Sequence, residues 1–276
     1  MKLRLQDVAP HRGLHWVRQG FANAFAQPLG YAALFAVFMM AVILVGSLPV
    51  VGGLLLLASV PLLGLGFTMA AVGAARGVRV HPAVFVAPWR GAPAVRRRRL
   101  IVLCLGYAVV SQAVLSLCGL IDGGSLDALM VLAASGQADP AQIDAALDAP
   151  GLVPGVMARL LLSTLVAIPY WHAAPLVHWG DQGVAQSLFS SVLALWRNRG
   201  AFLLYGLGWA GVALAGAGVL LLAVAVGLPA SLLALPLSLL CTVAFYASLH
   251  PCFTDCFAVV SEPADAAAAQ PDSPSA

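Results

Sequence analysis

Residues 29–48 read LGYAALFAVFMMAVILVGSL and contain no charged side chain. An α-helix rises about 1.5 Å per residue, so roughly 20 apolar residues cross the hydrocarbon core of a bilayer. This stretch is therefore long and apolar enough to span a membrane. Five more apolar runs follow it, at residues 50–75, 100–121, 154–177, 201–228 and 231–249. The sequence predicts an all-α, multi-pass membrane protein with six transmembrane helices.

The composition of the whole chain points to the same solvent. Of its 276 residues, 61% are hydrophobic and 9% are charged. A soluble domain usually carries about 25% charged residues, because its surface must be solvated. This chain has too few charges to cover a water-exposed globule of its size. We expect a single transmembrane domain over residues 1–260 and a disordered cytoplasmic tail over residues 261–276, where Ala, Pro, Ser and Asp dominate.

The charged residues are segregated along the chain. If the N-terminus is cytoplasmic, all of the 14 Lys and Arg residues except Arg159 fall on the cytoplasmic side. Lys and Arg resist translocation, so the pattern predicts that both chain ends are cytoplasmic and that the acidic segment 122–151 is a periplasmic loop. Within this loop, Asp139 and Pro140 are the types favoured at an N-cap and at the first helical position, so a short helix through Leu147 is expected.

Two segments have the pattern of amphipathic helices that lie in the cytoplasmic interface with an apolar stripe in lipid. The stripe of the first, residues 14–27, consists of Leu14, Val17, Phe21 and Phe25. That of the second, residues 184–198, consists of Val184, Leu188, Val192, Leu195 and Trp196, opposite a polar face that includes Ser187 and Ser191. Each precedes two apolar runs joined by a short Leu-Pro turn, which predicts an internal repeat of interfacial helix plus transmembrane hairpin. Residues 81–95, broken by Pro88 and Pro93, are interpreted as a degraded third copy.

Three groups of motifs carry a family resemblance. They are WHAAPLVHW at residues 171–179, SLF at 187–189 with WRN at 196–198 and AF at 201–202, and the segment from GL at 13–14 to QPL at 27–29. With these motifs the chain resembles a family of uncharacterised six-helix inner-membrane proteins from proteobacteria. The resemblance covers most of the chain except the acidic loop and the tail. It implies six spans in a bacterial inner membrane, and it brings no established activity.

Four consecutive arginines directly precede the third apolar run: Arg96, Arg97, Arg98 and Arg99. Anionic lipid headgroups are their expected ligands, because each basic residue near an anionic leaflet contributes about 1 kcal/mol. The alternative is that the arginines only set topology during insertion. We expect no nucleic-acid partner, since the run abuts a membrane span. A membrane-protein partner or a second copy of this chain is a further candidate.

Two histidines, His172 and His178, lie at the inner end of the fourth run, beside Trp171 and Trp179. The simplest interpretation is an interfacial belt, in which amphipathic rings sit at headgroup depth. The alternative is a shared proton or metal site. Residues six apart face different sides of a regular helix, so that site would require a bend at Pro175.

Arg159 is the cation nearest the outer side of the bilayer, and with the two histidines it completes a candidate polar site. We expect its side chain to reach the surface or to pair with Asp122, and the alternative is an arginine that faces a substrate. Near the inner end of the last span, Asp255 is expected to face Arg197 or Arg199.

His250, Cys252 and Cys256 are the candidates for a metal site, because imidazole and thiolate groups bind zinc. Their spacing matches none of the common structural zinc patterns, and a buried cysteine often acts as a small apolar residue. We therefore expect neither metal nor cofactor. The odd number of cysteines, five, also predicts no disulfide framework.

The sequence contains no P-loop, no Gly-x-Ser-x-Gly, no His-Glu-x-x-His and no paired carboxylates within the apolar runs. These absences disfavour an enzyme, and no catalytic residue is assigned. The favoured function is a non-enzymatic envelope scaffold or assembly partner that binds lipid or protein. The alternative is a transporter or channel for a small or lipid-like solute, which would require a polar cavity near His172, His178 and Arg159.

Overall fold

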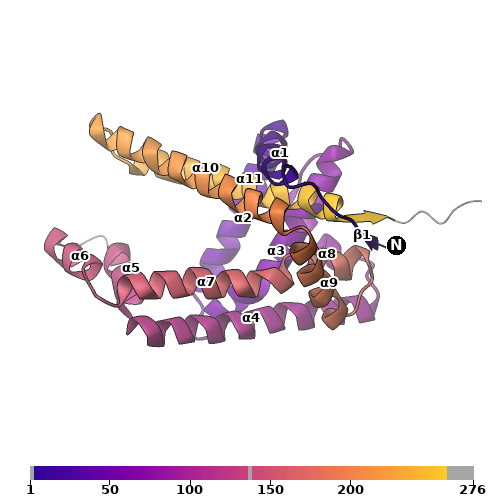
Figure 1. Ribbon diagram of the computed structural model, residues 1–276, viewed down its shortest axis with the longest axis horizontal. Helices are drawn as coiled ribbons and strands as arrows, with labels where there is room; N and C mark the ends of the chain where they lie inside the picture. Colours follow the sequence, from indigo (N-terminus) through magenta and orange to yellow (C-terminus); the bar gives the residue numbers. More distant parts are fainter. Residues whose placement is uncertain (1–2, 136–138, 260–276) are drawn as a thin grey trace, which may run out of the picture.

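The computed structural model describes residues 3–135 and 139–259 (Figure 1). Among these residues, six helical segments are long and apolar enough to cross a membrane. They are α2 (Pro28–Gly46), α3 (Gly52–Ala75), α4 (Ala94–Asp122), α7 and α8 together (Leu152–Tyr170 and Ala173–Trp179), α10 (Arg199–Ala225) and α11 (Ser231–Cys256). The prediction of an all-α, multi-pass membrane protein with six spans is confirmed. The tail predicted at residues 261–276 lies outside the described residues.

The six segments form three hairpins, α2–α3, α4–α7 and α10–α11. In Figure 1 the second and third hairpins extend toward the same side and diverge, with α5 (Ser125–Ser135) and α6 (Pro140–Leu147) at the far end of the second. Large apolar side chains cover the outside of these hairpins; Leu214, for example, is 75% exposed. Such a surface is stable only in lipid, because no water-soluble fold leaves so much apolar area uncovered.

The short helix predicted in the acidic loop is present as α6. Asp139 is its N-cap and accepts a hydrogen bond from the Ala141 N–H, while the side chain of Gln142 accepts one from the Asp139 N–H. This reciprocal capping box satisfies N–H groups that have no partner within the helix. At the other boundary of the loop, α4 ends at Asp122 and is capped by Gly123, whose φ of 59° is the left-handed conformation that glycine adopts without strain.

Three short segments pack the hairpins into a closed ring. α1 (Arg12–Ala26) packs on α10 and α11, although it precedes the first hairpin. The 3₁₀ turns η1 (Pro82–Phe85) and η2 (Ala87–Trp89) precede the second hairpin, and η1 packs on α2 and α3. α9 (Val184–Arg197) precedes the third hairpin and packs on α7 and α8. Each unit thus lays its leading segment on the previous hairpin, and the first unit closes the ring on the last.

The face that α1 buries differs from the predicted one. Of the apolar stripe expected there, Leu14 and Phe25 are exposed, at 49% and 62%. The buried residues of α1 are Gly13, Trp16, Val17, Gly20 and Ala24, so Val17 is the one member of the stripe among them. A Cβ on Gly13 would lie 2.0 Å from the Ala201 carbonyl oxygen of α10, and one on Gly20 would lie 2.3 Å from the Ala244 carbonyl oxygen of α11. The backbones of α1 and its neighbours approach so closely that only glycine fits.

The faces of α9 also differ from the simple amphipathic expectation, although Val184 and Leu188 of the predicted stripe pack against the protein core. Ser187 and Ser191, predicted on a solvated polar face, are fully buried against the α7–α8 segment. Val192 and Trp196, from the predicted stripe, are exposed on the opposite side, where lipid would cover them. Small serines allow close packing, and their buried hydroxyls are satisfied: Ser187 donates to the Val184 carbonyl within α9, and Ser191 donates to the Ile168 carbonyl of α7.

A two-stranded sheet joins the two ends of the described chain. β1 (Leu3–Leu5) pairs antiparallel with β2 (Phe257–Val259), with Arg4 opposite Ala258. Neither strand was predicted from the sequence. Both strands lie at the end of the molecule that also carries α9 (right in Figure 1). We call it the basic end, because Arg12 pairs with Asp255 just before β2, Arg197 pairs with Asp7 just after β1, and Arg99 pairs with Asp181 just before α9. Arg96, Arg97, Arg98 and Arg199 lie within three residues of these arginines in the sequence.

Candidate functional site

The fourth span is broken where α7 ends and α8 begins, and a serine from α9 occupies the break. The Ser191 hydroxyl accepts a hydrogen bond from the His172 N–H at 3.1 Å and donates one to the Ile168 carbonyl at 2.8 Å. In an unbroken helix, that N–H and that carbonyl would bond to each other, since they are four residues apart. The inserted hydroxyl therefore bridges the two groups and holds the helix open at this turn.

The break brings His172 into contact with two cysteines of α11. The donor atoms of His172, Cys252 and Cys256 all lie within 4.8 Å of one another, and the Cys252 Sγ lies 4.0 Å from the His172 Nε2. All three residues are buried, and the two cysteine side chains are completely so. We call these three residues the His–Cys cluster. Aromatic rings surround its imidazole, with centroids 5.4–5.9 Å away, at Phe202, Phe253 and Phe257.

The cysteines converge because they are four residues apart on the last turn of α11. Pro251 lies between His250 and Cys252 and has no N–H for the Ala247 carbonyl one turn earlier. The Asn23 side chain of α1 donates a hydrogen bond to that carbonyl at 3.3 Å. α1 therefore compensates the proline interruption at the turn that carries the cluster.

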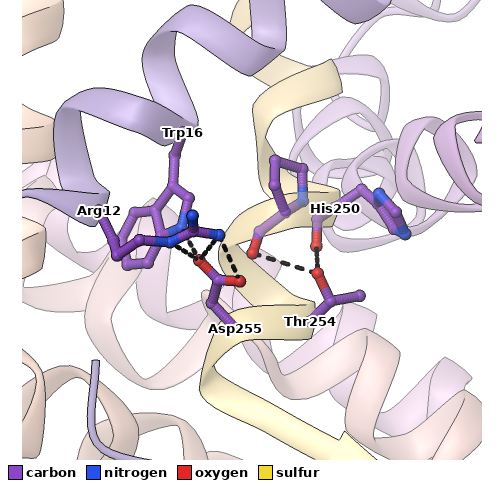
Figure 2. Close-up of polar contacts among 6 residues, drawn as sticks. Arg12, Trp16, His250, Thr254 and Asp255 are labelled. Atoms are coloured by element: carbon purple, nitrogen blue, oxygen red, sulfur yellow. Dashed lines mark hydrogen bonds and ion pairs between the residues drawn. The ribbon is translucent and has the colours of Figure 1, made fainter. Parts of the chain in front are cut away.

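Of the three metal-ligand candidates predicted from the sequence, the fold brings only two close together. Cys252 and Cys256 belong to the cluster, but His250 does not, and its ring points away from Asp255 in Figure 2. Consecutive helical residues differ by about 100° in direction, so His250 cannot share the face on which both cysteines lie. The third donor is His172, a residue 80 positions away from Cys252.

Asp255 also has partners other than the predicted ones. Arg12 Nε donates to one carboxylate oxygen at 2.8 Å and Arg12 Nη2 to the other at 2.9 Å, while the Trp16 indole N–H donates at 2.7 Å (Figure 2). The expectation that Asp255 faces Arg197 or Arg199 is wrong. Because α1 packs directly on α11, Arg12 and Trp16 in the first turns of α1 lie next to the Asp255 carboxylate. The arginines at the end of α9 and the start of α10 do not.

Arg197 is paired instead with Asp7 of the N-terminal segment, at 2.9 Å and 2.6 Å. The neighbouring Asn198 is buried and ties that segment down. Its side chain accepts from the Val8 N–H at 2.7 Å and donates to the Gln6 carbonyl at 3.1 Å and to the Cys256 Sγ at 3.7 Å.

The polar group proposed from Arg159, His172 and His178 does not form. Arg159 pairs with Asp122 at 3.5 Å and Asp127 at 2.9 Å near the loop, which confirms the expected partner Asp122. His178 stacks edge-on against Trp179 and stands apart from the His–Cys cluster. The bend needed to combine the two histidines is absent, because the break falls before α8 and leaves its own turns regular.

The four consecutive arginines divide into two pairs by helical position. Arg96 and Arg99, one turn apart, face inward toward Asp181, at 4.0 Å and 3.1 Å. Arg97 and Arg98 are exposed on the outer side of α4. Half of the run is therefore engaged within the protein, and the other half is free to meet a membrane surface.

A groove of about 630 Å³ lies between the second and third hairpins. Its walls come from α7, α9, α10 and α11 and are apolar and aromatic, with Arg199 as their one charged side chain: Thr164, Ala167, Ile168, Trp171, Val192, Leu195, Trp196, Arg199, Phe202, Leu203, Tyr205, Gly206, Trp209 and Phe245. A smaller apolar cavity of about 220 Å³, called the central cavity below, lies among α3, α4, α7, α8 and α11 and includes His172 in its wall.

No motif in the sequence predicted the His–Cys cluster as a unit or the roles of Ser191 and Asn198. One signal was available, since His172 and the two cysteines all fall near the inner ends of their spans and hence at similar depth. The residue that holds the helix break, Ser191, gives no such signal, because its role depends on how α9 packs.

Comparisons with known proteins give one informative relative. No family model matches the chain, and no solved structure matches it. The chain is 32% identical over 212 residues to a probable inner membrane protein of Burkholderia thailandensis, and the match covers 77% of each chain. That name states a location and no activity. At this identity and coverage, the six-span chain described here belongs to the family of that probable inner membrane protein.

Proposed function

We propose that the protein is a non-enzymatic scaffold of the inner membrane that binds anionic phospholipid in the groove between its second and third hairpins. The observation that carries this proposal is the combination of an apolar groove with one cation at its basic end. We further propose that the basic end faces the cytoplasm, which follows from the distribution of Lys and Arg.

The groove has the chemistry that a lipid requires. Its apolar and aromatic walls suit an acyl chain, and Arg199 provides a positive charge for a phosphate. The guanidinium of Arg199 lies 5.8 Å from the ring centroid of Trp196, which is 68% exposed. Within residues 3–135 and 139–259, Arg199 has no acidic partner in an ion pair, unlike Arg197 beside it. Its charge is therefore available to a headgroup.

The alternative, a transporter or channel, would require a polar cavity near His172, His178 and Arg159. The central cavity includes His172, but neither Arg159 nor His178 lines it, and its other walls are largely apolar and aromatic. A polar solute would lose its hydration there without gaining hydrogen bonds. A transporter could instead move a lipid-like solute along the lateral groove, whose walls are apolar. Reconstitution into vesicles tests this form of the alternative.

Native mass spectrometry of the purified protein tests lipid binding. Gly206 lines the groove and a Cβ there meets no atom within 4 Å, so the side chain of Gly206→Leu can project into the groove. Gly211 on the same helix also has open space but does not line the groove, so Gly211→Leu is the matched control. We expect retained phosphatidylglycerol or cardiolipin to fall several-fold in the first variant only. Equal retention in both variants would contradict the proposal.

Reconstitution into vesicles separates the scaffold from the transporter. A scaffold binds lipid without moving it, so a fluorescent phosphatidylglycerol should cross the bilayer no faster than in protein-free vesicles. Faster movement that Gly206→Leu abolishes and Gly211→Leu preserves would favour the alternative over the scaffold.

A further inference from the structure

We propose that His172, Cys252 and Cys256 bind one thiophilic metal ion with a filled d shell, Zn²⁺ or Cu⁺, beneath the N-terminal strand β1. This inference is independent of lipid binding, because the cluster contributes only His172 to the central cavity and no residue to the groove. Two thiolates and an imidazole are the donor set that such ions prefer over oxygen ligands.

The geometry of the cluster is close to that of a loaded site. Bonds of about 2.3 Å to sulfur and about 2.0 Å to nitrogen place the donor atoms of one ion roughly 3.5–4 Å apart. The Cys252 Sγ and His172 Nε2 are already 4.0 Å apart, and no pair in the cluster exceeds 4.8 Å. Displacements of the sulfur and nitrogen donor atoms by about 1 Å, through side-chain rotation, are therefore enough to close the site around an ion.

The surroundings hold the donors in place, as groups around metal ligands do. Ser191 fixes the main chain at His172 through the hydrogen bond to its N–H. The Asn198 side chain donates to the Cys256 Sγ at 3.7 Å and so orients that sulfur. Cys256 is fixed again by its carbonyl, which accepts from the Gln6 N–H at 2.9 Å.

Competing ligands are turned away from the cluster. Asp255, the nearest carboxylate in sequence, is engaged by Arg12 and Trp16 on another face of α11. The aromatic shell of Phe202, Phe253 and Phe257 limits access for water. A site with two sulfurs, one nitrogen and little water disfavours Mg²⁺ and Ca²⁺, which require oxygen ligands.

Charge and coordination number distinguish the two ions. Zn²⁺ balances two thiolates, so the loaded site is neutral, and its formation releases one proton from each thiol. Cu⁺ accepts three donors without a fourth ligand but leaves one negative charge, toward which the Asn198 N–H points. In either case no electron is transferred, and the metal replaces protons on sulfur.

The ion would connect the fourth span to the end of the sixth span, beneath the sheet of β1 and β2. His172 follows the break in the fourth span, both cysteines end the sixth, and β1 covers them by pairing with β2 directly after Cys256. A ligand that binds only the folded state stabilises it. We therefore expect the loaded protein to melt at a higher temperature than the stripped protein.

The test uses the full chain, purified in detergent, reduced, stripped with a chelator and titrated with Zn²⁺ or, without oxygen, with Cu⁺. Elemental analysis after desalting should give one ion per chain for the wild type and none for Cys252→Ala/Cys256→Ala. Cys118→Ala is the matched control, because Cys118 is buried in α4 away from the cluster. It should bind one ion and show the same rise in melting temperature as the wild type.

A second measurement needs no variant. Co²⁺ added to the stripped wild type should produce a thiolate-to-metal absorption band, and Zn²⁺ added in weak buffer should release about two protons per ion. The inference is overturned if the wild type binds no more metal than the double alanine variant, or if no thiolate band forms. Protein isolated without reductant can carry a Cys252–Cys256 disulfide instead of a metal ion. If such protein still binds no metal after the disulfide is reduced, the inference is overturned as well.

Discussion

At the scale of single residues, small polar side chains repair interruptions in the main chain. Ser191 bridges the two backbone groups left apart where α7 ends, and Asn23 bonds the carbonyl that Pro251 leaves without a partner. An unpaired backbone group in a membrane interior costs several kcal/mol, since no water is present to replace the lost bond. These side chains therefore decide whether the broken helices are stable in lipid.

We predict that Ser191→Ala lowers the free energy of unfolding in detergent by about 1–3 kcal/mol, because two buried backbone groups lose their partner. The matched control is Ser190→Ala, for which a change within about 0.5 kcal/mol is expected, as for substitutions away from such features. Denaturant titration of both variants measures the difference. Similar stability in the two would show that the bridge at His172 is dispensable.

At the scale of the elements, helix positions were predictable and helix faces were not. The length and apolarity of each run located all six spans, and residue types at Asp139 and Pro140 located α6. Hydrophobic periodicity could not orient α1 or α9, because apolar side chains are stable both in lipid and against protein. Size decided instead: Gly13, Gly20 and Ser187 face neighbouring helices.

The candidate site was predictable only in part, for a related reason. The two cysteines share a helix face through local spacing, which the sequence states directly. The position of His172 depends on a break held by Ser191, 19 residues further along the chain. Such a long-range cause leaves no periodic pattern near the histidine, so spacing alone favoured His250.

The close approach of α1 to α11 gives a prediction at this scale. Gly20→Val should destabilise the protein by about 1–3 kcal/mol, because its Cβ would lie 2.3 Å from the Ala244 carbonyl oxygen and one backbone must move. Gly218→Val on α10, where a Cβ meets nothing within 4 Å, is the control. Thermal unfolding in detergent compares the two, and equal melting temperatures would contradict the packing of α1.

At the scale of the whole molecule, three units close into a ring in which each leading segment covers the previous hairpin. The first and third units share the order of amphipathic helix and transmembrane hairpin, and two 3₁₀ turns replace the helix in the second. The ring fixes the basic ends of the hairpins together, while their far ends diverge (Figure 1). Because the second and third hairpins diverge, a lateral groove lies between them. Six helices packed in parallel along their full length would leave no such groove.

Orientation in the membrane is a prediction at the same scale. Alkaline phosphatase is active only after export, so a fusion after Leu147 should be active, and fusions after Arg90 or Val259 should be inactive. The reason is that six spans return the chain to its starting side. Strong activity of the fusion at Val259 would contradict an even number of spans.

Photo-crosslinking tests the central claim, a lipid held in the groove, most directly. Native membranes are labelled with a phosphatidylglycerol that carries a photoreactive group on its acyl chain, and the modified residues are mapped by peptide sequencing. We predict modification concentrated at groove residues of α10 such as Leu203 and Trp209, and its loss in Gly206→Leu but not in Gly211→Leu. Modification spread evenly over the exposed residues of α10, including Leu214 and Leu221, would show bulk lipid contact and contradict the proposed site.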